Sequence, residues 1–244
     1  MTSTDDGRAA RAVQGRIATG AARAGAGSET REHLSMKDFP AIVLSGTIWA
    51  YWTYVGAMAV RVRRRTRELA GIVPSQPLEQ VMWLIWIPLV AAWMALPYLA
   101  AMRTAAPWAL PAFAREMPFL GLRWLAAGLG IACLAVSIEC WRRMGESWRM
   151  AVAPDQKTDL VTTGLYQYVR HPIYAVSILL MLCTVVVAPT VPVAVMAAVH
   201  IALMNVKARN EERFLAGAHG AAYDQYCRRT GRFLPRVGRT AAAR

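Results

Sequence analysis

The sequence predicts an all-α, polytopic membrane protein with about five transmembrane helices, the last two forming a C-terminal helical hairpin. Composition is the first reason: 56% of the 244 residues are hydrophobic and only 18% are charged, which is too apolar for a soluble domain. The second is a series of uncharged runs that are long enough to cross a bilayer as helix. The third is the clustering of arginines between alternate runs, as the positive-inside rule requires.

The first three spans are expected within residues 39–149. Residues 39–60 and 80–102 are free of charged side chains over 22 and 23 positions, and about 20 residues of helix cross a bilayer core. Residues 117–138 contain one charge, Arg123, near the start of the run. A long side chain at that depth is expected to reach the headgroups.

The fourth apolar run, residues 171–206, is expected to form the hairpin. Its 36 residues include no Asp, Glu, Lys or Arg, which is too long for one crossing. Pro189 and Pro192 interrupt the run near its middle, where proline disfavours a continuous helix. The hairpin belongs to residues 150–236, the region in which the sequence concentrates its candidate chemistry.

Basic side chains give the expected orientation. The net charge of +13 comes from short clusters without the aromatic interleaving of a nucleic-acid-binding surface, so no nucleic acid is expected as a partner. The clusters follow the first span, the third span and the hairpin: Arg61, Arg63, Arg64, Arg65 and Arg67; Arg142, Arg143 and Arg149; and nine residues within 207–244. We expect these segments in the cytosol, so five crossings place the N-terminus outside.

Both ends of the chain are expected to be tails. Residues 1–38 are rich in Ala, Gly and Arg and lack the apolar core of a secretory signal, so they are expected to be disordered or to form an interfacial helix. Residues 237–244 form a basic tail. The four cysteines lie far apart and include no CxxC pair, so neither a disulfide framework nor a metal site is expected.

The densest polar segment, residues 160–174, leads into the hairpin. Pro172 suits the first turn of a helix, so Arg170 and His171 are expected at the N-terminal mouth of the fourth span, an end that attracts anions. Each has an ordinary structural alternative. Arginine and tyrosine anchor helices at membrane interfaces, and a histidine before a span often caps it.

The hairpin is expected to bring distant side chains to one level. His171 lies 19 residues before Thr190 and Glu211 lies 21 after it, so at about 1.5 Å per residue both lie roughly 30 Å from the turn. A second arm that stays helical through Glu212 makes the histidine and the paired glutamates face one another. Lys207 is then an i, i+4 neighbour of Glu211. A charged stop-transfer end with internal salt bridges is the alternative.

Four motifs in this region follow one another in a long, ordered pattern. They are LVTTGLY at 160–166, RHPxY at 170–174, EExxLxxxxGxxY at 211–223 and RFLP at 232–235. In this combination, over about a third of the chain, the sequence resembles the isoprenylcysteine carboxyl methyltransferase family and its phospholipid methyltransferase relatives. The resemblance implies an integral membrane enzyme that uses S-adenosylmethionine as methyl donor in a cytosolic pocket open to the bilayer.

The resemblance also implies a set of cofactor-binding residues. They are Leu160, Val161, Tyr166, His171, Pro172, Tyr174 and Glu211, with Glu212 supporting the pocket. We add Arg170 on chemical grounds, because the donor's carboxylate suits a histidine, an arginine and helix N–H groups. The donor's ammonium and ribose hydroxyls suit Glu211, and its adenine suits an apolar, aromatic bed.

The methyl acceptor is expected to be a lipophilic small molecule or a prenylated chain, in contact with membrane lipids. Where the family presents an arginine to a substrate carboxylate, this chain has Lys207, with Arg209 two residues on. With these two as the clamp, the first expectation is carboxyl O-methylation of an isoprenylcysteine-like substrate. With Glu212 as a base, the alternative is O- or N-methylation of a phenolic lipid or phospholipid.

Two functions of other classes stay open. One is an NADPH-dependent membrane sterol or enone reductase, and the other is a non-catalytic transporter or sensor. His200 and Asn205 in the fifth span, and Glu139 at the end of the third, are polar groups at membrane depth. A functional site and interhelical hydrogen bonding are alternative explanations for them. The oligomeric state is not predicted.

Overall fold

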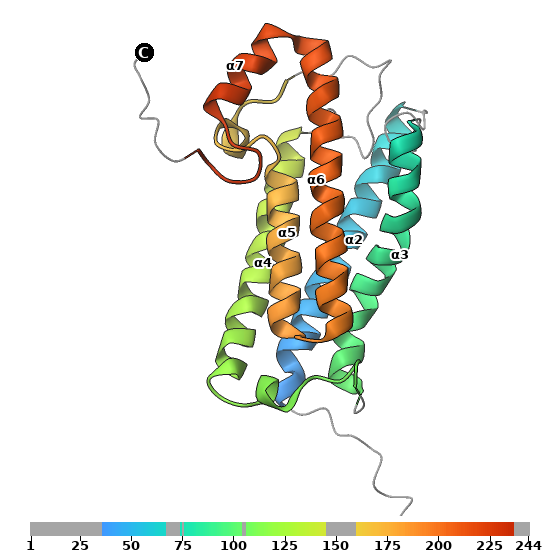
Figure 1. Ribbon diagram of the computed structural model, residues 1–244, viewed down its shortest axis with the longest axis vertical. Helices are drawn as coiled ribbons and strands as arrows, with labels where there is room; N and C mark the ends of the chain where they lie inside the picture. Colours follow the sequence, from blue (N-terminus) through green and yellow to red (C-terminus); the bar gives the residue numbers. More distant parts are fainter. Residues whose placement is uncertain (1–35, 67–73, 75, 104–105, 145–159, 237–244) are drawn as a thin grey trace, which may run out of the picture. The chain divides into compact units, whose positions relative to one another are not determined.

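Five long helices run side by side and make up most of the residues that the structure describes (Figure 1). The computed structural model describes residues 36–66, 74, 76–103, 106–144 and 160–236. The long helices are α2 (Phe39–Thr66), α3 (Pro77–Met102), α4 (Phe119–Met144), α5 (Pro172–Val187) and α6 (Val191–His219). A short helix, α7 (Ala221–Arg229), follows α6. No strand occurs among these residues, so the predicted all-α class is confirmed.

The predicted apolar runs all form helices, although they differ in how well they meet the requirements of a membrane span. α3, α4 and α6 are long and apolar enough to cross a bilayer by length and composition. α5 is equally apolar but has 16 residues, which at 1.5 Å each is about 24 Å of helix. α2 has 28 residues, and tyrosine, tryptophan and threonine side chains reduce the hydropathy of its middle turns.

The hairpin forms as predicted. α5 ends at Val187 and α6 begins at Val191, with Pro192 in its first turn, a position where the missing proline N–H breaks no helical hydrogen bond. α6 then continues beyond the apolar run to His219. This polar extension carries the candidate site residues of the second arm.

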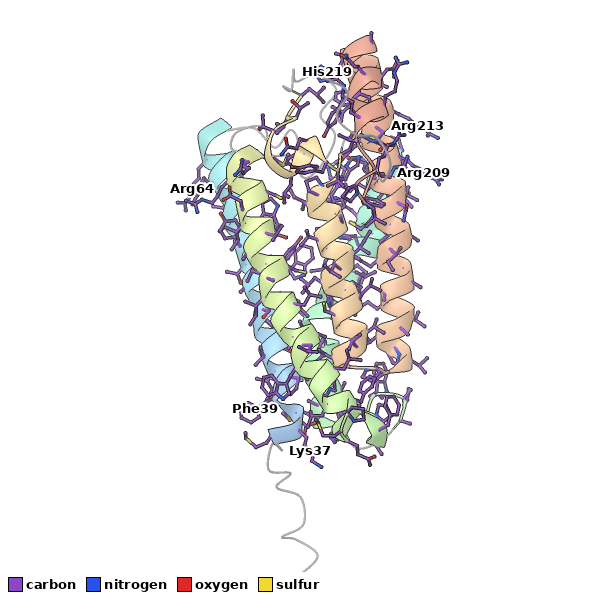
Figure 2. All side chains as sticks on the ribbon, turned by 90° about the vertical axis from the view of Figure 1, so that its left-hand side faces the viewer. Lys37, Phe39, Arg64, Arg209, Arg213 and His219 are labelled. Carbon is purple, nitrogen blue, oxygen red and sulfur yellow. The ribbon has the colours of Figure 1, made fainter. Side chains whose placement is uncertain are left out.

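The basic clusters that follow the first span and the hairpin lie at one end of the bundle (Figure 2). Arg64, Arg209, Arg213 and His219 lie at the end where α2 and α6 terminate, whereas Lys37 and Phe39 lie at the opposite end. The turn between α5 and α6 and the 3-10 helix Ala112–Arg115 are also at that opposite end (Figure 1). The basic segments therefore share one side, as the predicted topology requires.

Arg123 differs from expectation. Its side chain is fully buried rather than extended toward the headgroups. Nε donates to the carbonyl of Val187 at 2.8 Å, and Nη1 donates to the carbonyls of Lys37 at 2.7 Å and Ala114 at 3.0 Å. These carbonyls belong to three segments that are distant in sequence, so the guanidinium joins the segment before α2, the 3-10 helix Ala112–Arg115 and the end of α5 to α4.

The three polar residues predicted at membrane depth make different kinds of contact. His200 is buried and its Nε2 lies 3.1 Å from Ser177 Oγ of α5, which is interhelical hydrogen bonding. Asn205 donates to the carbonyl of Ile201 in its own helix. Glu139 is half-exposed and pairs with Arg143 at 2.7 Å.

Candidate functional site

The two arms of the hairpin meet where α5 begins and the polar extension of α6 passes it. His171 Nδ1 lies 3.6 Å from Glu211 Oε2, and its Nε2 lies 3.5 Å from Glu212 Oε1. The expected convergence of His171 and the paired glutamates is thus confirmed. His171 occupies the position before the first turn of α5, yet its side chain makes no capping hydrogen bond, so its ring faces the glutamates instead.

Glu211 joins this histidine to the interior of the bundle. Its Oε1 accepts a short hydrogen bond from the Tyr174 hydroxyl and lies 3.4 Å from Lys207 Nζ. The same Nζ lies 3.4 Å from Oε1 of Glu79, at the start of α3. Asn210 Nδ2 also donates to Glu79 Oε1, at 3.3 Å. Lys207 is therefore flanked by two carboxylates from different helices.

Glu212 faces the other way and holds the C-terminal segment. It accepts hydrogen bonds from Arg170 Nε at 3.0 Å and from Arg232 Nε at 3.0 Å. Burial raises the pKa of this carboxyl, but the nearby His171 imidazole and the hydrogen bonds from Arg232 and Arg170 outweigh burial and hold the pKa well below its usual range. The Glu212 hydrogen bond in turn raises the pKa of Arg232.

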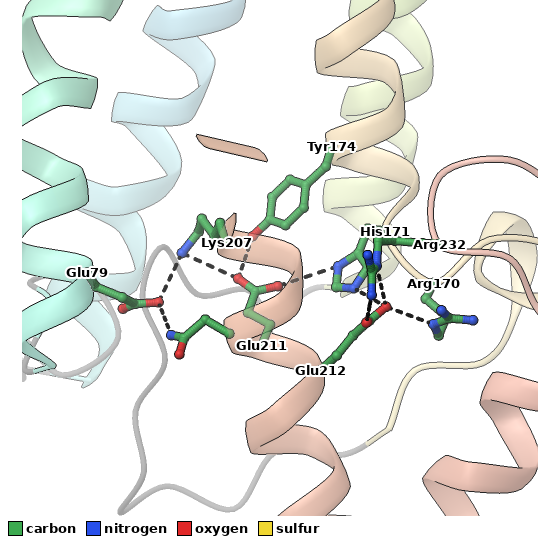
Figure 3. Close-up of polar contacts among 9 residues, drawn as sticks. Glu79, Arg170, His171, Tyr174, Lys207, Glu211, Glu212 and Arg232 are labelled. Atoms are coloured by element: carbon green, nitrogen blue, oxygen red, sulfur yellow. Dashed lines mark hydrogen bonds and ion pairs between the residues drawn. The ribbon is translucent and has the colours of Figure 1, made fainter. Parts of the chain in front are cut away.

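These side chains form one continuous line of polar contacts, which we call the polar cluster (Figure 3). Its members are Glu79, Lys207, Glu211, His171, Glu212, Arg170 and Arg232. They come from α3, α6, the start of α5 and the segment after α7. Three carboxylates thus face three permanent cations and one imidazole. Because these side chains have little contact with solvent, each charged group is stabilised mainly by its partners in the cluster.

The segment after α7 pairs with the residues that lead into α5. Arg170 N donates to the carbonyl of Gly231 at 2.8 Å, and His171 N donates to that of Arg232 at 3.1 Å. A Cβ on Gly231 would lie 1.7 Å from the carbonyl oxygen of Leu234, so this turn admits only glycine. The ring of Phe233 meets His171 edge-on. The RHPxY and RFLP motifs are therefore neighbours in space.

The remaining predicted cofactor residues lie around this pairing. Tyr166 is buried in the 3-10 helix Gly164–Gln167, and its carbonyl accepts a 2.7 Å hydrogen bond from Tyr226 of α7. Burial raises the pKa of Tyr226 to about 12, so it remains a donor. Leu160 and Val161 are partly buried just before this turn, and Pro172 is buried at the start of α5. Each role in cofactor binding remains a prediction.

Of the three predicted catalytic residues, Lys207, Arg209 and Glu212, only Arg209 lies outside the polar cluster. Its side chain is exposed and points away from α5 (Figure 2). The reason is helical phase, because positions two apart on a helix project from different faces. Lys207 and Arg209 therefore do not form the joint clamp that the sequence suggested.

Sequence reasoning missed Glu79 and did not assign a role to Arg232. Glu79 is 1% exposed, and the sequence signal for it was a single carboxylate immediately before an apolar run. Arg232 belongs to the RFLP motif, but its contact with Glu212 depends on the fold of α7. Neither partnership follows from spacing along the chain.

A cavity adjoins the polar cluster inside the bundle. It encloses about 780 Å³ of space free of protein atoms, a volume that includes the solvent at its open side. Glu79, Lys207 and Tyr174 line its polar end. Aromatic side chains supply much of the rest: Tyr51, Trp52, Trp83, Trp86 and Trp141. The arrangement joins a charged end to an apolar chamber.

Among the described residues, no group of three or more His, Cys, Asp or Glu side chains is placed to hold a metal ion.

Comparison with known proteins supports the resemblance. Residues 126–217 match the isoprenylcysteine carboxyl methyltransferase (ICMT) family. The chain is 28% identical over 116 residues to the nickel-cobalt-cadmium resistance protein NccN of Alcaligenes xylosoxydans xylosoxydans, covering 47% of this chain and 53% of that protein. It is 32% identical over 111 residues to the cobalt-zinc-cadmium resistance protein CzcN of Cupriavidus metallidurans, covering 45% and 50%.

The chain thus spans about half the length of the curated relatives it matches. The family match contains the whole hairpin together with His171, Lys207 and both paired glutamates. The predicted resemblance is therefore confirmed over these residues.

Proposed function

We propose that this protein binds S-adenosylmethionine beside His171 and Glu211 and transfers its methyl group to a lipophilic acceptor held within the bundle. The observation that carries the proposal is the meeting of His171 with Glu211 and Glu212 next to the cavity. The residues concerned lie inside the segment that matches a methyltransferase family. A reaction between a polar donor and an apolar acceptor needs this adjacency of a charged site and an apolar chamber.

The residues present suit this cofactor. His171 Nε2 is buried without a hydrogen-bond partner, and a buried polar atom of that kind calls for a ligand or water. The Glu211 side chain is 22% exposed and that of Glu212 is 15% exposed. Glu211 is therefore the better placed of the two carboxylates to accept hydrogen bonds from the donor's amino group or ribose hydroxyls. When bound, S-adenosylmethionine supplies an electrophilic methyl on a sulfonium sulfur. His171, Tyr174 and Glu211 would hold the donor by hydrogen bonds and position it at the cavity.

Glu212 and Arg170 support the site rather than react in it. Arg170 Nε donates a hydrogen bond to Glu212 Oε1, and Arg170 Nη1 donates another to the Thr230 carbonyl. Because its pKa is held low, Glu212 is a weak base. Its role is to fix Arg170 and Arg232, and through them the backbone that carries His171.

The acceptor would enter from the bilayer. An isoprenylcysteine-like carboxylate is the first candidate by family resemblance, with a phenolic lipid or phospholipid as the alternative. We propose that the site lies on the cytosolic side of a multi-pass membrane protein. Lys207, Glu211 and Glu212 lie on the same stretch of α6 as Arg209 and Arg213, and Arg64 lies at that end of the bundle too (Figure 2). Basic clusters of this kind are retained in the cytosol.

Cofactor binding distinguishes this function from an NADPH-dependent reductase. The protein in lipid nanodiscs should be titrated separately with S-adenosylmethionine and with NADPH by calorimetry. We expect binding of the first only, and its loss in His171→Ala. Glu139→Gln is the matched control, because its carboxylate lies in an exposed pair outside the site. Binding of NADPH without S-adenosylmethionine would reject methyl transfer.

A further inference from the structure

The charges at the polar end of the cavity restrict what can bind there. Lys207 is the only Lys or Arg among the described residues that line the cavity. Its Nζ lies 3.4 Å from a carboxylate oxygen of Glu79 and 3.4 Å from one of Glu211. One positive charge thus faces two negative charges. A carboxylate brought to this position would add a third negative charge in a poorly solvated site, which is unfavourable.

The interior of the cavity presents a different chemistry. Trp52, Trp86 and His200 line it from three helices. In each, one buried ring nitrogen has no hydrogen-bond partner: Nε1 in the two tryptophans and Nδ1 in the histidine. His200 is 1% exposed, and its other nitrogen is occupied by Ser177. The indole N–H groups only donate, so they favour oxygen atoms and disfavour an ammonium group. Buried polar atoms of this kind are rare unless a ligand or water meets them.

The two chemistries lie at different depths. His200 and Lys207 are seven residues apart on α6, which is about 10 Å along the helix axis. A single acceptor that meets both levels therefore carries oxygen at more than one position. The aromatic walls between them suit a ring or an apolar chain.

From these observations we propose that the cavity binds the methyl acceptor, and that this acceptor is an uncharged lipid with several oxygen atoms that is methylated on a hydroxyl group. This inference rests on the proposed function and replaces the carboxylate as the favoured acceptor. Glu79 determines the preference, because it cancels the charge of Lys207 that a carboxylate would need.

The reaction balances with the residues present. The acceptor's O–H bond breaks and its oxygen forms a bond to the methyl carbon, while the carbon–sulfur bond of the sulfonium breaks and leaves a neutral thioether. The proton passes to the carboxylate of Glu79, whose side chain lines the cavity. Glu79 is thus assigned as the general base.

Three acceptors and one substitution test the proposal. The wild-type protein in nanodiscs receives methyl-tritiated S-adenosylmethionine with a pentadecyl-dihydroxybenzene, the pentadecylbenzoic acid of the same tail, or N-acetyl-S-farnesylcysteine. We expect label on the dihydroxybenzene, stable in mild alkali, at a rate at least ten-fold above that of either carboxylate. Faster, alkali-labile labelling of a carboxylate would overturn the proposal while leaving methyl transfer intact.

Glu79→Gln should change the two activities in opposite directions. Loss of the base should reduce kcat for the dihydroxybenzene by about a hundred-fold or more. Loss of the negative charge should lower KM for the carboxylates, because Lys207 is then opposed by Glu211 alone. Affinity for S-adenosylmethionine should be retained, and Glu139→Gln should change neither activity. An equal fall in both activities would contradict the assignment of Glu79.

Binding provides a readout that does not depend on turnover. A brominated dihydroxybenzene should quench the fluorescence of the cavity tryptophans, and Trp52→Phe with Trp86→Phe should weaken its binding. Equal or stronger quenching by the brominated benzoic acid overturns the proposal. Failure to bind S-adenosylmethionine at all would instead reject the proposed function.

Discussion

His171 Nδ1 lies 3.6 Å from Glu211 Oε2, and the His171 ring lies parallel to that of Tyr174, with an angle of 5° between the planes. Tyr174 in turn donates its hydroxyl proton to Glu211. These three residues close a triangle between the first turn of α5 and the extension of α6. The triangle fixes the imidazole in one orientation, as a site that positions a ligand requires.

The first prediction concerns cofactor affinity. His171→Ala and Glu211→Ala should each weaken S-adenosylmethionine binding by about ten-fold to more than a hundred-fold, since a charged hydrogen bond contributes about 1.5 to 3 kcal/mol. Calorimetric titration in nanodiscs measures the change, and a thermal melt confirms that each variant is folded. Unchanged affinity in both variants would favour a stop-transfer end held by salt bridges.

The second prediction concerns the contacts of Glu212. Glu212→Ala leaves Arg170 and Arg232 without their carboxylate, and breaking such a pair from one side should destabilise the protein by about 3 kcal/mol. The loss should be concentrated in residues 230–236, whose backbone pairs with Arg170 and His171. Hydrogen exchange should become faster there, with the hairpin unchanged. Exchange that rises equally in the hairpin would contradict a local supporting role.

The low pKa of Glu212 adds a pH dependence to the same contact. A carboxyl whose pKa is lowered by folding stabilises the protein above its unfolded value of about 4.3, and this stabilisation decreases as the pH falls toward the folded value. Wild-type stability should therefore fall on acidification below about pH 4.3, and part of that fall should be absent in Glu212→Gln. Thermal melts at pH 7, 5 and 4 compare the two. Identical pH profiles would show that the Glu212 carboxylate does not contribute.

Sequence periodicity predicted the site as far as local geometry allows. Helical rise alone placed His171 opposite Glu211, because both arms of the hairpin are straight and begin at one turn. It did not separate Lys207 from Arg209, because the rise along the helix axis does not specify the face from which each side chain projects. The partners Glu79 and Arg232 come from elements whose placement depends on tertiary packing, and so no spacing rule reveals them.

Arg123 illustrates the same limit at the other end of the bundle. A single charge near the start of an apolar helix is expected to extend toward water. Here three backbone carbonyl groups from other segments accept its hydrogen bonds instead. Those carbonyls belong to Lys37, Ala114 and Val187, which are distant in sequence, so only the assembled bundle shows that the guanidinium has partners.

The third prediction follows from that burial. Arg123→Leu should lower the free energy of unfolding by about 3 kcal/mol or more, because three backbone carbonyls, those of Val187 and Ala114 in buried residues, lose their donor. Arg123→Lys should recover only part of this, since an ammonium is a point charge and not a planar fork. Thermal unfolding in nanodiscs measures both. Arg213→Leu is the control, and its effect on the free energy of unfolding should be small because Arg213 is exposed on α6. An equally small effect of Arg123→Leu would contradict the proposed role of Arg123 in joining these segments.

The last prediction tests which side of the membrane carries the site. The exposed residue Arg236 follows α7, and the exposed residue Met117 precedes α4. Because α7 and the start of α4 lie at opposite ends of the bundle (Figure 1), a cysteine at each position reports a different side. Cys227→Ser provides the background, since the other three cysteines are buried. In intact cells, a membrane-impermeant maleimide should label Met117→Cys and not Arg236→Cys, and lysis should expose the second. Because basic segments are retained in the cytosol, labelling of Arg236→Cys without lysis would reverse the topology and move the polar cluster, with its donor site, to the outer face.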